Sequence, residues 1–116
     1  QGRAFWIERE GCVWLVQRAS SGMLGGMRAL PDDGWSAAGD GSGEPPVSGA
    51  WEEAGVVRHA FTHFAIELGV LRCDGAPANM PGEGEWWPVD RIEDAGLPTL
   101  FAKASRLARA AGERLL

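Results

Sequence analysis

Cysteine and long hydrophobic segments are scarce in this sequence. Its 116 residues contain two cysteines, Cys12 and Cys73, and both lie inside apolar segments. Two thiols cannot hold a zinc ion or an iron–sulfur cluster by themselves, and they do not form the disulfide framework of a small secreted domain. We therefore expect two free thiols in a reducing compartment, the cytoplasm. No apolar segment is long enough to cross a membrane as a helix, so no membrane contact is expected.

Positive charge is scarce as well. Lys103 is the only lysine, it stands beside ten arginines, and the net charge is −5 at pH 7. Affinity for DNA of any sequence comes from clustered lysines and arginines, so this balance argues against a protein that binds DNA on its own. The segment 32–53 carries six acidic residues and no basic one, whereas 1–30 and 57–72 have more arginines than acids. The last two segments could together form a basic edge.

A chain of this length makes one domain with its own hydrophobic core. The predicted elements are strands at 4–10, 12–18, 56–73 and 85–90, a hairpin turn at Glu10-Gly11, a packed loop at 21–34, a short helix at 47–55 between Ser48 and Gly55, and a final helix that begins at Pro98 and Thr99. Strands with one helix in the middle and one at the end predict an α/β domain, a mixed sheet flanked by helices.

The strand pattern is interrupted at Phe-Thr-His-Phe, residues 61–64. Over residues 64–70 the large apolar side chains fall on every second position, which is typical of a half-buried strand. Extended backwards, the same alternation would bury Thr62 and expose Phe61 and His63, the reverse of what a hydrophobic core favours. Either the strand breaks here, or the chain displays a ring, a hydroxyl and an imidazole to a ligand.

Each of these side chains also has a structural interpretation. Phe61 could be a core residue after a kink, Thr62 a loop hydroxyl bonded to its own backbone, and His63 a structural histidine. His59 is interpreted as structural. Aromatic rings are usually buried, so we also expect the six tryptophans to be core and sheet-face residues rather than platforms for bases; they are Trp6, Trp14, Trp35, Trp51, Trp86 and Trp87.

No nucleophilic triad and no glycine-rich phosphate loop is visible in the sequence. The segment 52–56, Glu-Glu-Ala-Gly-Val, resembles the end of the Nudix box, the helix that binds magnesium in nucleoside-diphosphate hydrolases. In that register Gly34 fits the first glycine, Asp40 replaces the first glutamate, and Ser48 and Gly49 stand where the family has Arg-Glu. Magnesium requires several hard oxygens in octahedral array, which two adjacent glutamates do not supply. We therefore predict a Nudix-like fold without a metal site.

Three blocks carry a second resemblance, which covers most of the chain. VWLVQRASSGMLGGMRALP at 13–31, VRHAFTHFAIELGV at 57–70 and WWPVDRIEDAGLPTLFAKA at 86–104 follow one another in the order found in MutY-type adenine DNA glycosylases. The chain resembles the C-terminal domain of that family, a Nudix-fold module that helps to recognise 8-oxoguanine. It departs from the family pattern at Ala19, where proline is frequent, and at Arg28, where an aromatic residue is common.

This resemblance implies a lesion-reading role for the interrupted strand. 8-Oxoguanine carries an N7–H donor and an O8 acceptor where guanine has an N7 acceptor and a C–H, and a threonine hydroxyl can both donate and accept. Thr62 could meet that edge, Phe61 could wedge against bases, and His63 could brace the loop or touch a phosphate. Main-chain N–H groups of the glycine-containing loop could approach phosphates. The residues expected to contact lesion or DNA are Phe61, Thr62, His63, Ser20, Ser21, Gly25 and Gly26.

The resemblance also implies that the chain is part of a longer glycosylase, as its abrupt start inside a strand-like segment suggests. The catalytic domain, outside this chain, would carry the catalytic acid and a [4Fe-4S] cluster, whereas this chain would hold no cofactor and no catalytic residue. The expected partners are duplex DNA containing 8-oxoguanine and that catalytic domain, in a monomer associated with the bacterial nucleoid. Two alternatives stay open: a stand-alone Nudix hydrolase of oxidised nucleotides, and a protein-docking module.

Overall fold

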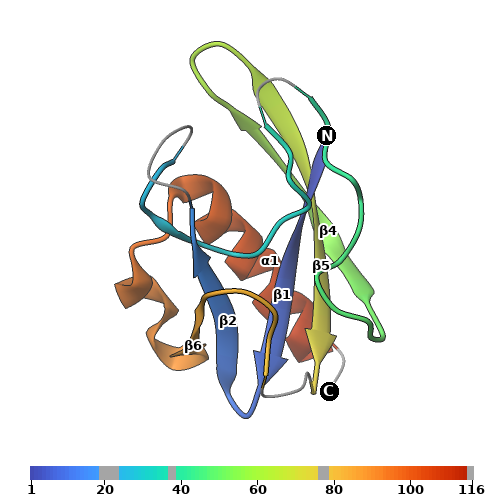
Figure 1. The fold of residues 1–116 in the computed structure, drawn as a ribbon, viewed down its shortest axis with the longest axis vertical. Helices are drawn as coiled ribbons and strands as arrows, with labels where there is room; N and C mark the ends of the chain where they lie inside the picture. Colours follow the sequence, from blue (N-terminus) through green and yellow to red (C-terminus); the bar gives the residue numbers. More distant parts are fainter. Residues whose placement is uncertain (19–23, 37–38, 76–78, 115–116) are drawn as a thin grey trace.

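The computed structural model describes residues 1–18, 24–36, 39–75 and 79–114. Its elements are β1 (Gly2–Arg9), β2 (Cys12–Gln17), β3 (Arg28–Ala29), β4 (Glu52–Ala60), β5 (Ala65–Asp74), β6 (Glu85–Pro88), the 3₁₀ helix η1 (Val89–Ala95) and the helix α1 (Thr99–Arg114). Figure 1 shows α1 lying across one face of the sheet, where it contacts β4, β5 and β1. None of the helices in these ranges is long and apolar enough to cross a membrane.

The strands form one mixed sheet. Their order is β3-β2-β1-β5-β4, and β6 pairs with β2 beside this path. The two central strands, β1 and β5, are parallel, and the other neighbours are antiparallel. A single domain with a mixed sheet flanked by helices confirms the predicted fold class.

Two local predictions are confirmed. The β1–β2 hairpin turns at Glu10 (φ 48°) and Gly11 (φ 76°), a pair of left-handed residues that matches the twist of a tight hairpin. Helix α1 begins at Thr99, directly after Pro98, whose carbonyl accepts from the Ala102 N–H (2.8 Å). Its apolar side, including Leu100 and Ala104, is buried against the sheet.

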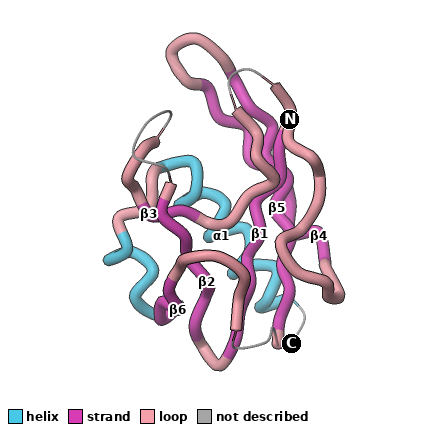
Figure 2. Tube along the Cα trace, in the orientation of Figure 1, coloured by secondary structure: helices cyan, strands magenta, loops and turns pink. Residues whose placement is uncertain are grey.

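The predicted short helix at 47–55 is wrong. Glu52 begins β4 instead, and the strand pairs with β5 from Glu52 opposite Arg72 to Ala60 opposite Ala65. A bulge interrupts the pairing at Gly55, whose φ of 143° lies outside the helical region. Figure 2 shows the preceding segment as loop. The physical reason is that β5 pairs with β1 on one side and needs a partner strand on its other side, which outweighs the weak local signal of a Ser cap and a Gly stop.

The long predicted strand at 56–73 is likewise two strands, β4 and β5, joined by a hairpin. The alternation in its second half is confirmed, because Ile66, Leu68 and Val70 are buried against α1. On the opposite face of the sheet, Phe5 and Ile7 form a smaller cluster that is covered by loop residues and β6 rather than by a helix. The sheet therefore has one face under α1 and one face under irregular chain.

The tryptophans pack into these two clusters, as predicted. Trp6, Trp14 and Trp35 are buried. Trp51 and Trp86 lie half-buried over the second cluster, where the Trp14 and Trp86 rings meet edge to face with centroids 5.1 Å apart. Trp87 lies half-buried over the larger cluster, so the tryptophans of the chain are largely structural.

A buried arginine joins β5, β1 and α1. Arg72 donates from Nη1 to the Ala108 carbonyl (2.6 Å), and from Nη2 to Glu8 Oε1 (3.0 Å) and Asp74 Oδ1 (2.7 Å). Burial by itself would lower the pKa of Arg72, but the hydrogen bonds and charges of Asp74 and Glu8 raise the pKa above its usual value. The guanidinium therefore stays charged, and each of its nitrogens has a partner.

We expect Arg72→Met to lower the free energy of unfolding by about 3 kcal/mol, because it leaves a helix carbonyl and the Glu8 carboxylate without their donor. The control is Arg58→Met, which removes an exposed ion pair with Glu67 and should cost less than about 1 kcal/mol. Urea unfolding of both variants measures the difference. Equal losses would show that the buried network contributes no more than a surface pair.

Cys73 is a buried thiol. Burial raises the pKa of Cys73, the nearby charge of Asp74 raises it further, and a backbone hydrogen bond from Ala50 opposes both. As the pH rises above the ordinary thiol pKa, the unfolded chain loses this proton before the folded chain does. The free energy of unfolding should therefore fall with rising pH in the alkaline range.

In a Cys12→Ser background, we expect iodoacetamide to alkylate folded Cys73 much more slowly at pH 8.5 than the same thiol in denaturant, because the thiolate is disfavoured and enclosed. Mass spectrometry of timed samples measures the two rates. Similar rates in both states would mean that the thiol is open to solvent and titrates normally.

Candidate functional site

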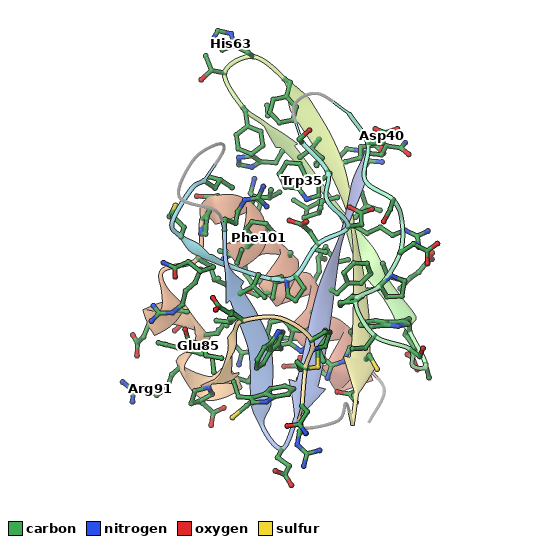
Figure 3. All side chains as sticks on the ribbon, in the orientation of Figure 1. Trp35, Asp40, His63, Glu85, Arg91 and Phe101 are labelled. Carbon is green, nitrogen blue, oxygen red and sulfur yellow. The ribbon has the colours of Figure 1, made fainter. Side chains whose placement is uncertain are left out.

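The β4–β5 hairpin ends in a two-residue tip. The Phe61 N–H donates to the Phe64 carbonyl over 2.7 Å, which closes the turn around Thr62 and His63. Both tip residues are exposed, and Figure 3 shows His63 at the far end of the molecule, beyond the body of the sheet. The strand thus breaks where its alternation fails, and the break displays a hydroxyl and an imidazole.

Aromatic rings support this tip from below. The rings of Phe61 and Phe64 stack with centroids 4.9 Å apart, and His59 meets Phe61 edge to face at 4.8 Å. Both phenylalanines are half-buried and pack on the main core. Lys103 Nζ of α1 lies 3.3 Å from His59 Nδ1, which ties the hairpin to the helix. Phe61 is therefore engaged in packing, as its structural interpretation predicts.

The glycine-containing loop before β3 is closed by its own hydrogen bonds. The Gly26 N–H donates to the Arg18 carbonyl (3.1 Å), and Gln17 Nε2 donates to the Gly26 carbonyl (2.8 Å). Gly26 has a φ of 76°, a left-handed backbone conformation that favours glycine at this position. Its amide is thus committed to the turn, and its expected contact with a phosphate stays a prediction. Gly25 is half-buried.

Ser20 and Ser21, which the sequence assigned to the same surface, lie outside the described residues. Leu24, at the described start of the loop, packs on the same core cluster as Phe61 and Phe64. Of the predicted contact residues, the structure therefore brings together the three at the hairpin tip and places the glycines in a separate turn.

The acidic residues do not fit a magnesium site. Glu52 and Glu53 are neighbours on a strand, so their side chains leave opposite faces of the sheet. Gly34 and Asp40, which also fit the Nudix-box register, are themselves not helical. Across the described ranges, no group of three His, Cys, Asp or Glu side chains is placed to hold a metal ion.

The possible basic edge of segments 1–30 and 57–72 is wrong. Four of its arginines are paired with carboxylates: Arg9 with Glu10 (4.0 Å), Arg18 with Asp32 (2.6 Å), Arg28 with Glu85 (3.2 Å) and Arg58 with Glu67 (3.7 Å). Arg72 is buried in its own network. Acids that are mostly distant in sequence therefore neutralise these positive charges, which a count along the chain could not show.

Sequence reasoning missed the contact between His59 and Lys103. The two residues lie 44 positions apart and meet only because α1 packs against β4. The available signal was that Lys103 is the only lysine, in a helix whose other basic residues are arginines. Asp33 was also missed: its carboxylate accepts from the Arg3 and Gly43 amides and organises the loop beside the N-terminal end of β1.

Known structures share this fold. The C-terminal domain of mouse MUTYH, solved in complex with human PCNA, is 17% identical with a TM-score of 0.74, over 97% of this chain and 88% of that one. The NUDIX domain of Shewanella oneidensis NrtR, solved with ADP ribose, is 17% identical with a TM-score of 0.71, over 99% and 87%. The Nudix hydrolase RenU of M. smegmatis is 19% identical with a TM-score of 0.65, over 98% and 86%.

These identities establish a common fold and nothing finer. Comparison with the sequences of curated proteins gives no significant match. A family model described as NUDIX domain matches residues 3–107, which is most of the sequence. The mixed sheet, the helix across its face and this match agree, and the chain belongs to the NUDIX domain family.

Proposed function

We propose that this chain recognises 8-oxoguanine opposite adenine, on behalf of an adenine DNA glycosylase whose catalytic domain lies outside it. The observation that carries the proposal is the supported hairpin tip, in which Thr62 and His63 are exposed and His63 lies at the end of the molecule (Figure 3). Two further points support it: the three sequence blocks that resemble MutY-type glycosylases, and the fold shared with the C-terminal domain of mouse MUTYH.

The chemistry of Thr62 suits the lesion. Its exposed hydroxyl can donate to O8 of 8-oxoguanine or accept from N7–H, and its own backbone offers the complementary group. Guanine has no N7–H and no O8, so the same contact would be lost. An unmade hydrogen bond of this kind costs about 1–3 kcal/mol, which corresponds to a preference of about 5- to 150-fold.

The support of the tip adds to this recognition. Because Phe61 and Phe64 stack on one another and on the core, the two displayed residues are held on a rigid hairpin. Less conformational entropy is then lost when the tip binds, which favours discrimination by one or two hydrogen bonds. In this proposal Phe61 positions the reader, and His63 reaches an adjacent phosphate.

The remaining parts of the reaction are assigned to the absent catalytic domain. That domain would flip and excise the adenine, and it would hold the [4Fe-4S] cluster with four cysteines of its own. Cys12 and Cys73 are free thiols on different strands, one half-buried and one buried, so they do not fit such a cluster. The proposed partners are duplex DNA and the catalytic domain, with the chain acting as a monomer.

A Nudix hydrolase of oxidised nucleotides is the second candidate, favoured by the fold shared with hydrolases such as RenU. Magnesium-dependent release of pyrophosphate from 8-oxo-dGTP, abolished by Glu52→Gln with Glu53→Gln, would establish it. We expect no release above background, because the two carboxylates leave opposite faces of β4. A docking module for a protein partner, as in the MUTYH–PCNA complex, would instead leave lesion preference unaffected by changes at Thr62.

The test compares Thr62→Val, which removes the hydroxyl and keeps the shape, with Thr62→Ser, which keeps the hydroxyl. We expect the wild-type chain to bind a duplex with adenine opposite 8-oxoguanine at least about fivefold more tightly than one with adenine opposite guanine. Thr62→Val should abolish this ratio, and Thr62→Ser should retain most of it. Fluorescence anisotropy at low salt measures the dissociation constants.

Thermal unfolding supplies the stability control, because an exposed tip residue should shift stability by no more than about 0.5 kcal/mol. A wild-type chain without lesion preference, or a Thr62→Val variant that keeps the wild-type ratio, would contradict the proposed reader.

A further inference from the structure

Three basic side chains on α1 differ from most of the other described arginines. Six arginines pair with carboxylates; they are Arg9, Arg18, Arg28, Arg58, Arg72 and Arg91. In contrast, Lys103, Arg106 and Arg109 form no ion pair with any carboxylate of the described residues. Arg3 forms no such ion pair either, but its Nη1 donates to the Gly43 carbonyl (3.2 Å). In a chain of net charge −5, the three charges on α1 are therefore a group of unpaired charges on one element. We call them the α1 stripe.

The α1 stripe crosses the solvent side of the helix obliquely. Its members are spaced by three residues, so each lies about 60° around the helix from the last and about 4.5 Å further along it. Lys103 sits at the β4 side, beside His59, while Arg106 and Arg109 line a hollow between α1 and η1. Arg106 is exposed, and the other two are half-buried.

The hollow beside the arginines has an apolar floor and a volume of about 200 Å³. Ile92, Leu97 and Ala102 line it together with the two arginines. Glu93 lines it as well and forms no ion pair with either arginine within the described residues. The guanidinium groups therefore stand over a fixed surface of packed helices rather than on a mobile loop.

The α1 stripe is continuous with the lesion-reading hairpin. The Lys103–His59 contact places one end of the stripe four residues before His63 on the same hairpin. From Lys103 to Arg109 the helix rises about 9 Å.

We propose that Lys103, Arg106 and Arg109 bind the phosphate backbone of the DNA strand whose lesion the Thr62 hairpin reads. This inference rests on the proposed function and extends it to a second surface. Charge complementarity supports it, because Lys103, Arg106 and Arg109 form no ion pair among the described residues, whereas most other described arginines are neutralised by carboxylates. DNA is favoured over an acidic peptide because the stripe adjoins the hairpin whose tip is proposed to read the lesion.

The experiment neutralises the stripe and compares it with matched charges elsewhere. The stripe variant is Lys103→Gln, Arg106→Gln, Arg109→Gln. The control variant is Arg3→Gln, Arg58→Gln, Arg91→Gln, which changes the net charge by the same amount through residues away from α1. Binding of the whole 116-residue chain to lesion-containing and undamaged duplexes is followed by anisotropy between 50 and 200 mM salt, with circular dichroism as the folding control.

Each phosphate contact contributes about 0.9 to the slope of log K against log salt. We expect the stripe variant to lose about 2 to 3 units of slope and to weaken on both duplexes. The control variant should lose less than 1 unit. Thr62→Val should leave the slope unchanged and alter only the ratio between duplexes, so the two proposals fail separately.

Equal losses in the stripe and control variants would overturn the inference, because only the net charge would matter. It would also be overturned if the wild-type chain bound neither duplex at 50 mM salt, or if a poly-glutamate peptide bound the stripe and duplex DNA did not. The wild-type chain could instead show no lesion preference while its salt slope still falls in the stripe variant. That outcome would contradict only the proposed role of Thr62.

Discussion

The charged group that the rest of the structure depends on is the guanidinium of Arg72. It links the two parallel central strands to α1 through Glu8, Asp74 and the Ala108 carbonyl. Helix and sheet approach closely enough for this only because position 112 is glycine, where an added Cβ would lie 2.4 Å from Nη1. Since Arg72 also stands opposite Trp6 in the β1–β5 register, the network fixes how β5 sits in the sheet. The far end of β5 leads back to the hairpin tip, so this interaction helps to position the proposed reader.

The hairpin shows how one segment can be both packed and displayed. Phe61 and Phe64 face inward as a stacked pair, and the two residues between them cannot follow the strand alternation without burying a polar group. The turn resolves this conflict by ending the strand. Further down the same hairpin, Glu52 and Glu53, which stand in the register of a metal-binding helix, form the start of an edge strand instead. The fold is thus retained while these carboxylates are placed where they cannot cooperate on one ion.

Charge pairing gives this acidic domain a selective surface. Most described arginines are held by carboxylates from other elements, so their contribution to long-range attraction is largely cancelled. The three basic residues along α1 are not cancelled in this way. A polyanion would therefore approach in one orientation, along the helix that also anchors the hairpin through His59. Repulsion elsewhere contributes to that selectivity as much as attraction does.

The sequence by itself determined the single domain, the mixed sheet, the Glu10-Gly11 turn, α1 and the break at Thr62, because each depends on local periodicity or on a turn residue. Only the tertiary structure decided that Glu52 begins a strand, since the need of β5 for a partner outweighs a weak helix signal. It also decided which arginines are neutralised, because ion pairs such as Arg28–Glu85 join residues 57 positions apart. Local patterns show which side of a segment packs against the core. The ion pairing of the arginines and the packing beneath the hairpin tip depend instead on which distant segments come into contact.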